Sequence, residues 1–319
     1  MQTITVRAPA KVNLTFDILG KRPDGFHDIE TIFQSISLED ELKIQIEESE
    51  QNYFAIDCDN PVLRRLMPLD ESNLIGKAAR AYLNQEKAGS HFNIRVHLDK
   101  KIPIGAGLAG GSSNAAAMLI ALNSYFGNRL NSTELSQLAS QIGSDVPFCL
   151  QGGTSIGRGK GEILEPIPCA IEFFYCIIKP RKLSVSTPWA YNNFDDYRAV
   201  VKKPDLVVVK NALCLGDIEA AIAGFGNVFE PMVMQEYPEL AKLKAQVLDL
   251  GAWACQMTGS GPTLFAVVPG REMGHHIRRQ ILGDDDIGFV YGTEEIILEA
   301  LPPIDFRLAE SCSHGVRIV

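Results

Sequence analysis

The sequence carries a glycine-rich stretch whose composition and spacing suit phosphate binding. Residues 103–113 read PIGAGLAGGSS, which contains the pattern G-x-G-x-x-G and ends in two serines before a helix-forming run. Glycine lets backbone N–H groups approach a ligand closely, and the N-terminus of the following helix presents its positive dipole end to the same place. The stretch therefore predicts an anion cradle, with a tight turn and an ordinary serine cap as the alternative interpretation.

The surroundings of this glycine loop exclude the better-known classes that share its pattern. A dinucleotide-binding loop directly follows a strand and is answered about 20 residues later by an acidic residue at the end of the next strand. Here DKKIP separates the loop from the preceding strand, and the region about 20 residues later is predicted to be another helix. A protein kinase would carry V-A-I-K, H-R-D and D-F-G motifs, and a Walker A loop would carry a lysine before its serine. None of these stands at the required position, so a different phosphate site is predicted.

The elements that must position the loop follow from local patterns in the first half of the chain. Apolar residues alternate from Thr3 to Ile18, which predicts a strand with one buried face and with Lys11 and Asn13 on the polar face. The turn KRPDGFH leads to predicted strands at IETIFQSISL, ELKIQIEE and FNIRVHL. Helices are predicted at SNLIGKAARAYLNQ, capped by Ser72 or Asn73, at about 114–126, capped by Ser112, Ser113 or Asn114, and at about 132–142, capped by a Ser or Thr and closed by Gly143.

The second half of the chain predicts a separate domain. The stretch GGTSIGRGKGE interrupts all periodicity, which places a domain junction between about 150 and 180. Strands are predicted at FFYCIIKP and TLFAVV, and helices at VKNALC, PELAKLKAQVLDLG and REMGHHIRRQIL. This interleaving without a regular βαβ rhythm favours the α+β class. We expect domains at 1–160 and 161–301 and, because residues 302–319 show no clear period, a loose tail.

Composition narrows the class of protein. The chain has 319 residues, 46% of them apolar and 22% charged, and no apolar run of the ~20 residues that a membrane span needs. A net charge of -9 argues against a nucleic-acid partner but allows a small anionic substrate in a local basic pocket. The start, MQTITVRAPAKVN, predicts no secretory signal and hence a cytoplasmic location, and seven scattered cysteines predict reduced thiols without a metal site.

Three stretches, in order, resemble the three motifs of the GHMP kinases, a family named for galactokinase, homoserine kinase, mevalonate kinase and phosphomevalonate kinase. They are PAKVNL at 9–14, PIGAGLAGGSSNAA at 103–116 and MTGSGPTLFAV at 257–267, and the resemblance runs from about residue 5 to about 300. RPDGFHDIETIFQSI and GSDVPFCLQGG are similar to the branch whose substrate carries a cytidine diphosphate group, rather than to homoserine or mevalonate kinases.

The resemblance implies an overall fold and a reaction. The fold is a two-domain GHMP kinase fold, with an N-terminal domain like domain 2 of ribosomal protein S5 and a ferredoxin-like C-terminal domain. The reaction is transfer of a phosphoryl group from ATP, with Mg²⁺, to an alcohol of a small cytidine diphosphate substrate. No protein ligand of the metal and no oligomeric state is implied. The residues expected to contact ATP are Pro103, Ile104, Gly105, Ala106, Gly107, Leu108, Ala109, Gly110, Gly111, Ser112 and Ser113.

The remaining site residues are likewise carried over from the family. Lys11 and Asp145 match its catalytic pair, Asn13, Phe26, His27 and Tyr191 its substrate pocket, and Gly259, Ser260 and Gly261 a loop near the phosphates. His27 would meet the cytosine, and Phe26 stands where the family often has tyrosine, so that stacking is kept but a hydroxyl is lost. Taken alone, these residues have plainer interpretations: a helix cap for Asp145, a solvated strand lysine for Lys11, a turn residue for His27 and a hairpin turn for Gly259–Gly261.

Overall fold

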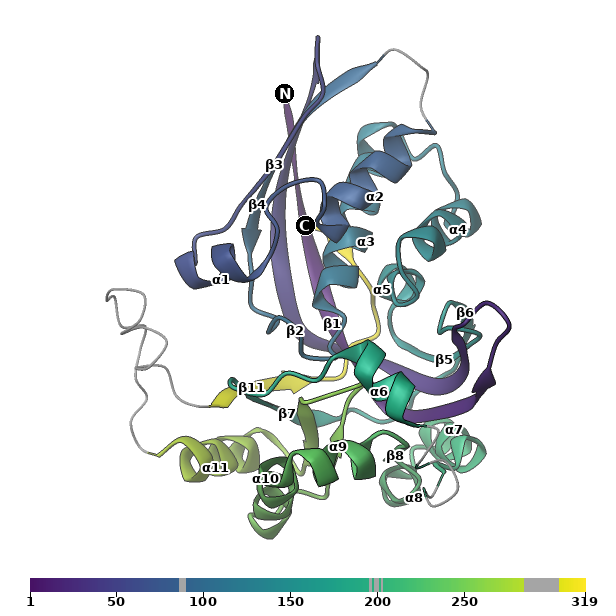
Figure 1. Cartoon of the computed structure of the whole chain (residues 1–319), viewed down its shortest axis with the longest axis vertical. Coiled ribbons are helices and arrows are strands. Elements are labelled where there is room, and N and C mark those ends of the chain that lie inside the picture. The colour runs from purple at the N-terminus through teal and green to yellow at the C-terminus, as the bar shows by residue number, and fades with distance from the viewer. Residues whose placement is uncertain (86–89, 195–196, 198–200, 202, 284–303) are drawn as a thin grey trace.

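The structure is a computed structural model that describes residues 1–85, 90–194, 197, 201, 203–283 and 304–319 (Figure 1). Within these residues the chain forms one sheet of eight strands and one of four. Figure 1 shows the two sheets one below the other, with the purple and blue strands of the first half above and the green elements of the second half below. Helices and strands interleave along the chain, which confirms the predicted α+β class.

The larger sheet is built around one long antiparallel pair. β1 (Gln2–Lys21) pairs with β2 (His27–Ser49) along almost its whole length. The main order is β12-β1-β2-β4-β3, with β3 at Tyr53–Asp57, β4 at His91–Asp99 and β12 at Arg317–Ile318. β5 (Thr154–Arg158) pairs with β2 and β6 (Ile163–Pro166), and β8 (Gly226–Asn227) pairs with β1.

The strand predicted from Thr3 to Ile18 is confirmed, whereas the strands predicted at IETIFQSISL and ELKIQIEE are one continuous strand, β2. The acidic stretch between them stays paired with β1, because Asp40 lies opposite Ala8 and Glu41 opposite Arg7. The pairing register shifts between Pro9 and Ala10 as a β-bulge, so β2 continues through this stretch without a turn.

Helices of the first half pack on this sheet. They are α1 (Pro61–Leu66), α2 (Leu74–Leu83), α3 (Gly110–Tyr125), α4 (Ser132–Ile142) and α5 (Val146–Gln151). The central helix, α3, is buried on most sides because it contacts β1, α2 and α5. Asn73 caps α2, as predicted, but α4 is capped by Asn131 in a capping box with Glu134 and not by the Ser or Thr that follow. Gly143 ends α4, as predicted.

The smaller sheet has the order β11-β7-β10-β9, formed by β7 (Phe174–Pro180), β9 (Ala254–Met257), β10 (Leu264–Val268) and β11 (Ile304–Glu310). The helices of the second half are α6 (Thr187–Phe194), α7 (Leu206–Leu215), α8 (Ile218–Ala223), α9 (Glu230–Glu236), α10 (Pro238–Asp249) and α11 (Arg271–Leu282). Strands and helical segments follow one another as β-α-β-β-α-β, which is the ferredoxin-like arrangement that was expected.

The two faces of the smaller sheet have different partners. Cys176, Ile178 and Leu264 share a core with α10 and α11. On the other face, Ile177 and Phe265 share a core with the first-half strands and with Ile102, Ala106 and Leu108 of the glycine loop. The loop is therefore held where the two sheets meet.

The expectation of a loose tail after Pro302 is wrong for residues 304–319. β11 pairs with β7 in the smaller sheet, and β12 pairs with β1 in the larger one. Between them, the Val316 N–H donates to the Cys149 carbonyl, so the end of the chain ties the two sheets together. The sequence shows no single period here because Phe306 and Ala309 contribute to two different cores. The domain boundary near residue 160 stays a prediction.

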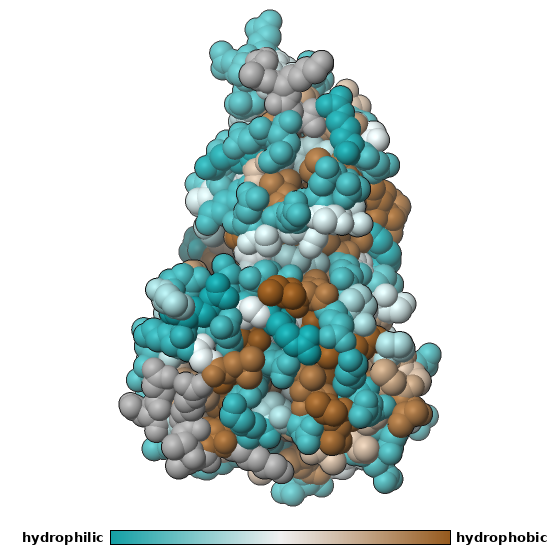
Figure 2. All heavy atoms as spheres, turned by 90° about the vertical axis from the view of Figure 1, so that its right-hand side faces the viewer, coloured by the Kyte–Doolittle hydropathy of each residue, from teal (hydrophilic) through white to brown (hydrophobic). Residues whose placement is uncertain are grey.

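The outer surface mixes polar and apolar groups. On the side shown in Figure 2, hydrophobic residues are interspersed among hydrophilic ones, and their patches are largest in the lower half. In the described part of the chain, no helix combines the length and apolar character needed to cross a membrane.

Candidate active site

Lys11 is buried at the centre of the site, with 4% of its surface exposed. Its Nζ donates to Asn13 Oδ1 at 2.8 Å and to the Gly107 carbonyl at 3.0 Å, and lies 3.6 Å from Asp145 Oδ2. The interpretation of Lys11 as a solvated strand lysine is therefore wrong. Taking an ammonium group out of water is costly unless its partners are well placed, so this arrangement fixes the position of one positive charge.

Asp145 occupies the N-cap position of α5, yet its side chain makes no capping hydrogen bond. The helix needs little capping because Pro147 lacks an N–H and the Val146 N–H donates to the Gly143 carbonyl. The carboxylate instead faces Lys11 and keeps 32% of its side chain exposed. The helix-cap interpretation is thus right about the position of Asp145 and wrong about its side chain, whose carboxylate can reach both the buried cation and a ligand.

Asn13 and Thr258 join the first and third motifs beneath Lys11. Asn13 Oδ1 accepts from Lys11 and from the Thr258 hydroxyl at 3.1 Å, and its Nδ2 donates to Thr31 Oγ1 at 2.8 Å. Asn13 is only 1% exposed, so in this structure it orients Lys11, and its predicted contact with substrate stays a prediction. Thr258 lies within the third motif, but sequence reasoning singled out only the glycines and the serine beside it.

The glycine loop leads into α3 in a way that differs from the predicted serine cap. α3 begins at Gly110, and its N-cap is Ala109, in the left-handed conformation and without a side-chain hydrogen bond. Ser113 is fully buried, and its hydroxyl donates to the Pro9 carbonyl at 2.7 Å. The first N–H groups of the helix are consequently left without a capping side chain, which suits an anion.

Asp40 anchors the start of the glycine loop and was missed by sequence reasoning. Its fully buried carboxylate accepts from the backbone N–H groups of Lys101 and Ile102, from the Asn114 side chain and from Lys100 Nζ. Lys100 is itself 5% exposed at its side chain, so the ion pair is buried on both sides. The sequence did contain one indication of this role. Asp40 is a carboxylate at an alternate position of the strand that would normally be apolar, between the buried Leu38 and Leu42.

The third-motif loop packs directly on the glycine loop. A Cβ on Gly107 would lie 2.5 Å from the Thr258 carbonyl oxygen, and one on Gly259 would lie 3.3 Å from the Gly107 carbonyl oxygen. Gly107, Gly259 and Gly261 all have positive φ. Asn227, which was also missed, donates from Nδ2 to the carbonyls of Met257 and Gly259 at 2.8 Å each. The hairpin therefore faces the predicted phosphate loop, with the Ser260 and Thr187 hydroxyls 3.0 Å apart at its tip.

An aromatic group lies beside this centre. The His27 ring stacks on Tyr191 with centroids 4.9 Å apart, and Tyr191 meets the edge of Phe229. Burial, with a smaller contribution from Asp145, raises the pKa of Tyr191. His27 is 9% exposed, which contradicts its interpretation as a surface turn residue, whereas the neighbouring Phe26 is 57% exposed. The structure thus brings together two residues of the predicted pocket from distant segments.

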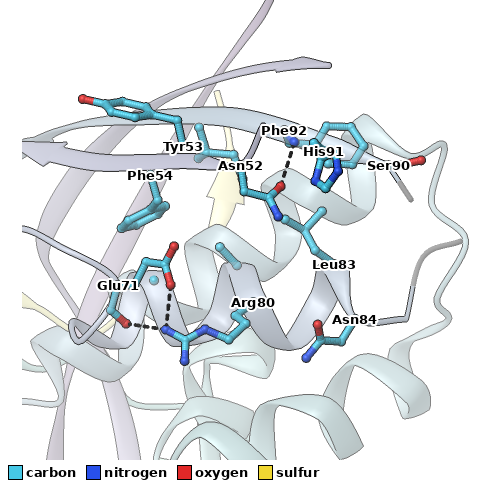
Figure 3. A pocket seen from close by; sticks show the side chains of 13 residues that line it. Asn52, Tyr53, Phe54, Glu71, Arg80, Leu83, Asn84, Ser90, His91 and Phe92 are labelled. Carbon is cyan, nitrogen blue, oxygen red and sulfur yellow. Dashed lines mark hydrogen bonds and ion pairs between the residues drawn. The ribbon is translucent and has the colours of Figure 1, made fainter. Parts of the chain in front are cut away.

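A pocket of about 530 Å³ lies away from this centre, among α2, β3 and β4. Figure 3 shows Arg80 paired with Glu71 on one side and the Phe92 N–H donating to Asn52 on the other. None of the predicted site residues lines this pocket, so the motifs, and not cavity size, locate the candidate site. Among the described residues, no three His, Cys, Asp or Glu side chains are grouped so that they could hold a metal ion.

Sequence models of known families match both halves of the chain. The model for the GHMP kinases N terminal domain matches residues 73–153, and the model for the GHMP kinases C terminal matches residues 206–282. The fold and the motif order agree with these matches. The chain belongs to the GHMP kinase family of small-molecule kinases.

Within the family, two similar curated proteins share one name. The chain is 38% identical over 286 residues to 4-diphosphocytidyl-2-C-methyl-D-erythritol kinase of Synechococcus sp. (strain JA-2-3B'a(2-13)), covering 87% of this chain and 89% of that one. It is 35% identical over 333 residues to the kinase of the same name from Acaryochloris marina, covering both chains fully.

Solved structures agree on the fold. A crystal structure of 4-(cytidine 5'-diphospho)-2C-methyl-D-erythritol kinase matches with a TM-score of 0.71 at 27% identity, over 97% of this chain and 100% of that chain. Homoserine kinase from Cytophaga hutchinsonii matches with a TM-score of 0.70 at 22% identity, over 100% of this chain and 98% of the other, and this likeness supports the fold alone. The predicted two-domain GHMP kinase fold is confirmed.

Proposed function

We propose that the protein transfers the γ-phosphoryl group of ATP to the 2-hydroxyl of 4-diphosphocytidyl-2-C-methyl-D-erythritol. The products are the 2-phosphate and ADP, and the step belongs to non-mevalonate isoprenoid precursor biosynthesis. The names of the curated relatives support this substrate. The observation that carries the chemistry is the Lys11–Asp145 pair, at 3.6 Å, beside the two glycine loops.

The pair suits transfer to an alcohol. The Asp145 carboxylate would accept a hydrogen bond from the substrate hydroxyl, and would orient it or take its proton as the bond to phosphorus forms. A carboxylate is a weak base for an alcohol, so orientation of the hydroxyl is one of the two roles that fit. Lys11, fixed by Asn13 and the Gly107 carbonyl, would stabilise Asp145 and the transferring phosphoryl group.

The nucleotide would bind at the glycine loop. The uncapped start of α3 and the positive-φ backbone at Gly105 and Gly107 offer N–H groups to phosphate oxygens. Mg²⁺ would enter with the nucleotide and would neutralise phosphate charge, and a site of this kind would hold it through one or two carboxylates together with the phosphates. Asp145, which keeps part of its carboxylate exposed, fits that minimal requirement.

The aromatic group would select the acceptor. His27 stacked on Tyr191 offers a flat apolar surface with ring nitrogens, which suits a pyrimidine base, and Phe26 offers a further exposed ring. Homoserine and mevalonate have no ring to stack there, which disfavours the alternative of another GHMP small-molecule kinase. A cytoplasmic location, the lack of a nucleic-acid partner and either oligomeric state, monomer or homodimer, are further predictions.

The test is ADP release in a coupled assay with MgATP and 4-diphosphocytidyl-2-C-methyl-D-erythritol, with homoserine and mevalonate measured alongside. Turnover confined to the cytidine substrate, and slowed by about 10²-fold or more in Asp145→Asn and Lys11→Ala, is expected. Asp59→Asn and Lys43→Ala are matched controls at exposed positions and should retain activity. Turnover of another acceptor alone would reject the substrate, and full activity of both site variants would reject the catalytic pair.

A further inference from the structure

The loop between β5 and β6 holds a cation at the edge of the site that the reaction described above does not use. This loop carries Lys160 within the second glycine-rich stretch, GRGKGE. Its backbone is fixed on both sides: the Gly159 carbonyl accepts from the Ile29 N–H at 2.8 Å, and the Gly161 N–H donates to the Arg158 carbonyl at 3.0 Å. Glu162 Oε2 accepts from the Lys160 N–H at 2.6 Å. The loop is therefore fixed against β2, and the Lys160 side chain extends from a defined backbone position.

The Lys160 side chain lies over an exposed ring and not against a carboxylate. Its Nζ is 4.7 Å from the centroid of Phe26. In the described part of the chain, no carboxylate oxygen lies within ion-pair distance of this ammonium group, whereas neighbouring cations are paired. Arg22 pairs with Asp24 and Asp28, Arg158 with Glu30 and Glu165, and Lys210 with Glu165. Lys160 is thus available to an anion that arrives with a ligand.

The loop that carries Lys160 also borders both groups that a cytidine substrate would engage. On one side, Phe26 is followed by His27, which stacks on Tyr191. On the other side, a Cβ built on Gly161 would lie 3.9 Å from Asp145 Oδ1, so the same loop borders the reacting carboxylate. A substrate with its base at the aromatic group and its hydroxyl at Asp145 has its diphosphate between these two points.

We propose that Lys160 binds the diphosphate of the cytidine substrate and so selects a nucleoside diphosphate over an uncharged nucleoside. This inference rests on the proposed function. The lysine ammonium has three donors and a full positive charge for phosphate oxygens, and it lies over the exposed Phe26 ring. Lys160 acts in substrate binding and takes no part in the bond that forms to phosphorus.

The test measures binding of CDP and of cytidine by calorimetry in the full chain and in Lys160→Met. Hydrogen bonds to charged groups imply a loss of CDP affinity of about 10- to 100-fold, with cytidine affinity unchanged. Lys160→Arg should recover most of the loss. The matched control is Lys242→Met, which removes an exposed lysine from α10, a helix that covers the opposite face of the smaller sheet.

Steady-state kinetics separates this inference from the proposed function. The KM for the cytidine substrate should rise in Lys160→Met by the same factor as the CDP affinity falls, while the KM for ATP and kcat stay within about threefold of wild type. The CDP affinity of wild type should also weaken with added salt more steeply than that of the variant. An unchanged ratio of CDP to cytidine affinity in Lys160→Met, with an active wild type, overturns the role of Lys160 alone. A wild type that binds neither CDP nor cytidine overturns the proposed function as well.

Discussion

The proposed reacting centre and the proposed substrate edge of this site are built in opposite ways. At the reacting centre, Lys11 and Asn13 are almost wholly buried, and each polar group has a protein partner. At the substrate edge, Phe26 is 57% exposed and the ammonium of Lys160 rests over its ring. The polar groups of the first region are fixed before any ligand binds, whereas the ring and the ammonium group of the second region remain available to contact a ligand.

This difference separates the demands of catalysis from those of selection. Phosphoryl transfer gains most from charges that are already in place, because the protein then need not reorganise in the transition state. A substrate-binding surface has a higher affinity for its ligand when its cations and rings have no competing partner inside the protein. Changes at buried anchors should accordingly affect both folding and activity, whereas changes at the edge should affect substrate affinity alone.

The largest effect is expected at Asp40, the buried anchor of the glycine loop. Asp40→Asn leaves the Lys100 ammonium without its countercharge, and breaking one side of a buried ion pair typically costs about 3–5 kcal/mol. The free energy of unfolding, measured by urea denaturation, should fall by that amount, and the KM for ATP should rise as the loop shifts.

The matched control is Glu41→Gln on the same strand. Glu41 pairs at the surface with Arg7 and Lys43, and such pairs contribute roughly 0–1 kcal/mol. Equal stability losses for the two variants would contradict the role of Asp40 as an anchor.

The next largest effect is expected where the two glycine loops touch. Gly107→Ala combines a left-handed backbone with a Cβ that would lie 2.5 Å from the Thr258 carbonyl oxygen, so one loop must move. A displacement of about 1 Å near reacting groups can reduce kcat by about 10²-fold. Gly127→Ala is the control, because it has the same positive φ but nothing within 4 Å, and it should retain kcat.

Gly105→Ala tests the proposed phosphate contact separately from the packing of the two loops. Its φ is also positive and its added Cβ meets no protein atom. If ATP phosphates approach this backbone as proposed, the variant should raise the KM for ATP while its stability matches that of Gly127→Ala. An unchanged KM for ATP would place the phosphates elsewhere.

Local patterns predicted most of the longer elements because those elements depend on neighbouring residues. The alternation in β1, the apolar run of β10 and the signals around α2 are properties of short windows. β11 and β12 were missed because their pairing partners, β7 and β1, lie far away in the sequence. The start of α3 was misplaced because Ala109, in a left-handed conformation that alanine rarely adopts, precedes the helix, so that no serine serves as its cap.

The residues of the candidate site likewise divide into those that sequence motifs identify and those whose partners lie far along the chain. The motif residues Lys11 and Asp145 were identified through the family resemblance, and the structure brings them within ion-pair distance. Asp40 and Asn227 act through backbone atoms of segments far along the chain, namely residues 101–102 and the carbonyls of Met257 and Gly259. A single sequence contains no spacing rule for such contacts. Only Asp40 could have been noticed, because it is a charged residue at a strand position that would normally be apolar.

The smallest effect is expected at Glu165, which ties the β5–β6 hairpin to α7. Hydrogen bonds from Lys210 and then Arg158 lower the pKa of Glu165 to about 2. An unfolded chain protonates this carboxyl near pH ~4.3, so the stabilisation is present above that pH and is lost as the pH falls toward 2. Glu165→Gln should therefore flatten the decline of unfolding free energy between pH 4.5 and about 2.

This effect stays small because the Glu165 side chain is 45% exposed and water screens its ion pairs. At neutral pH, the variant should loosen only the Arg158 side of the Lys160 loop, since the Gly159 and Gly161 backbone bonds remain. The KM for the cytidine substrate should then change by less than about threefold, in contrast to Lys160→Met. A KM rise in Glu165→Gln as large as that in Lys160→Met would mean that the edge of the site, like its centre, depends on a prearranged network, and the contrast between the two regions would fail.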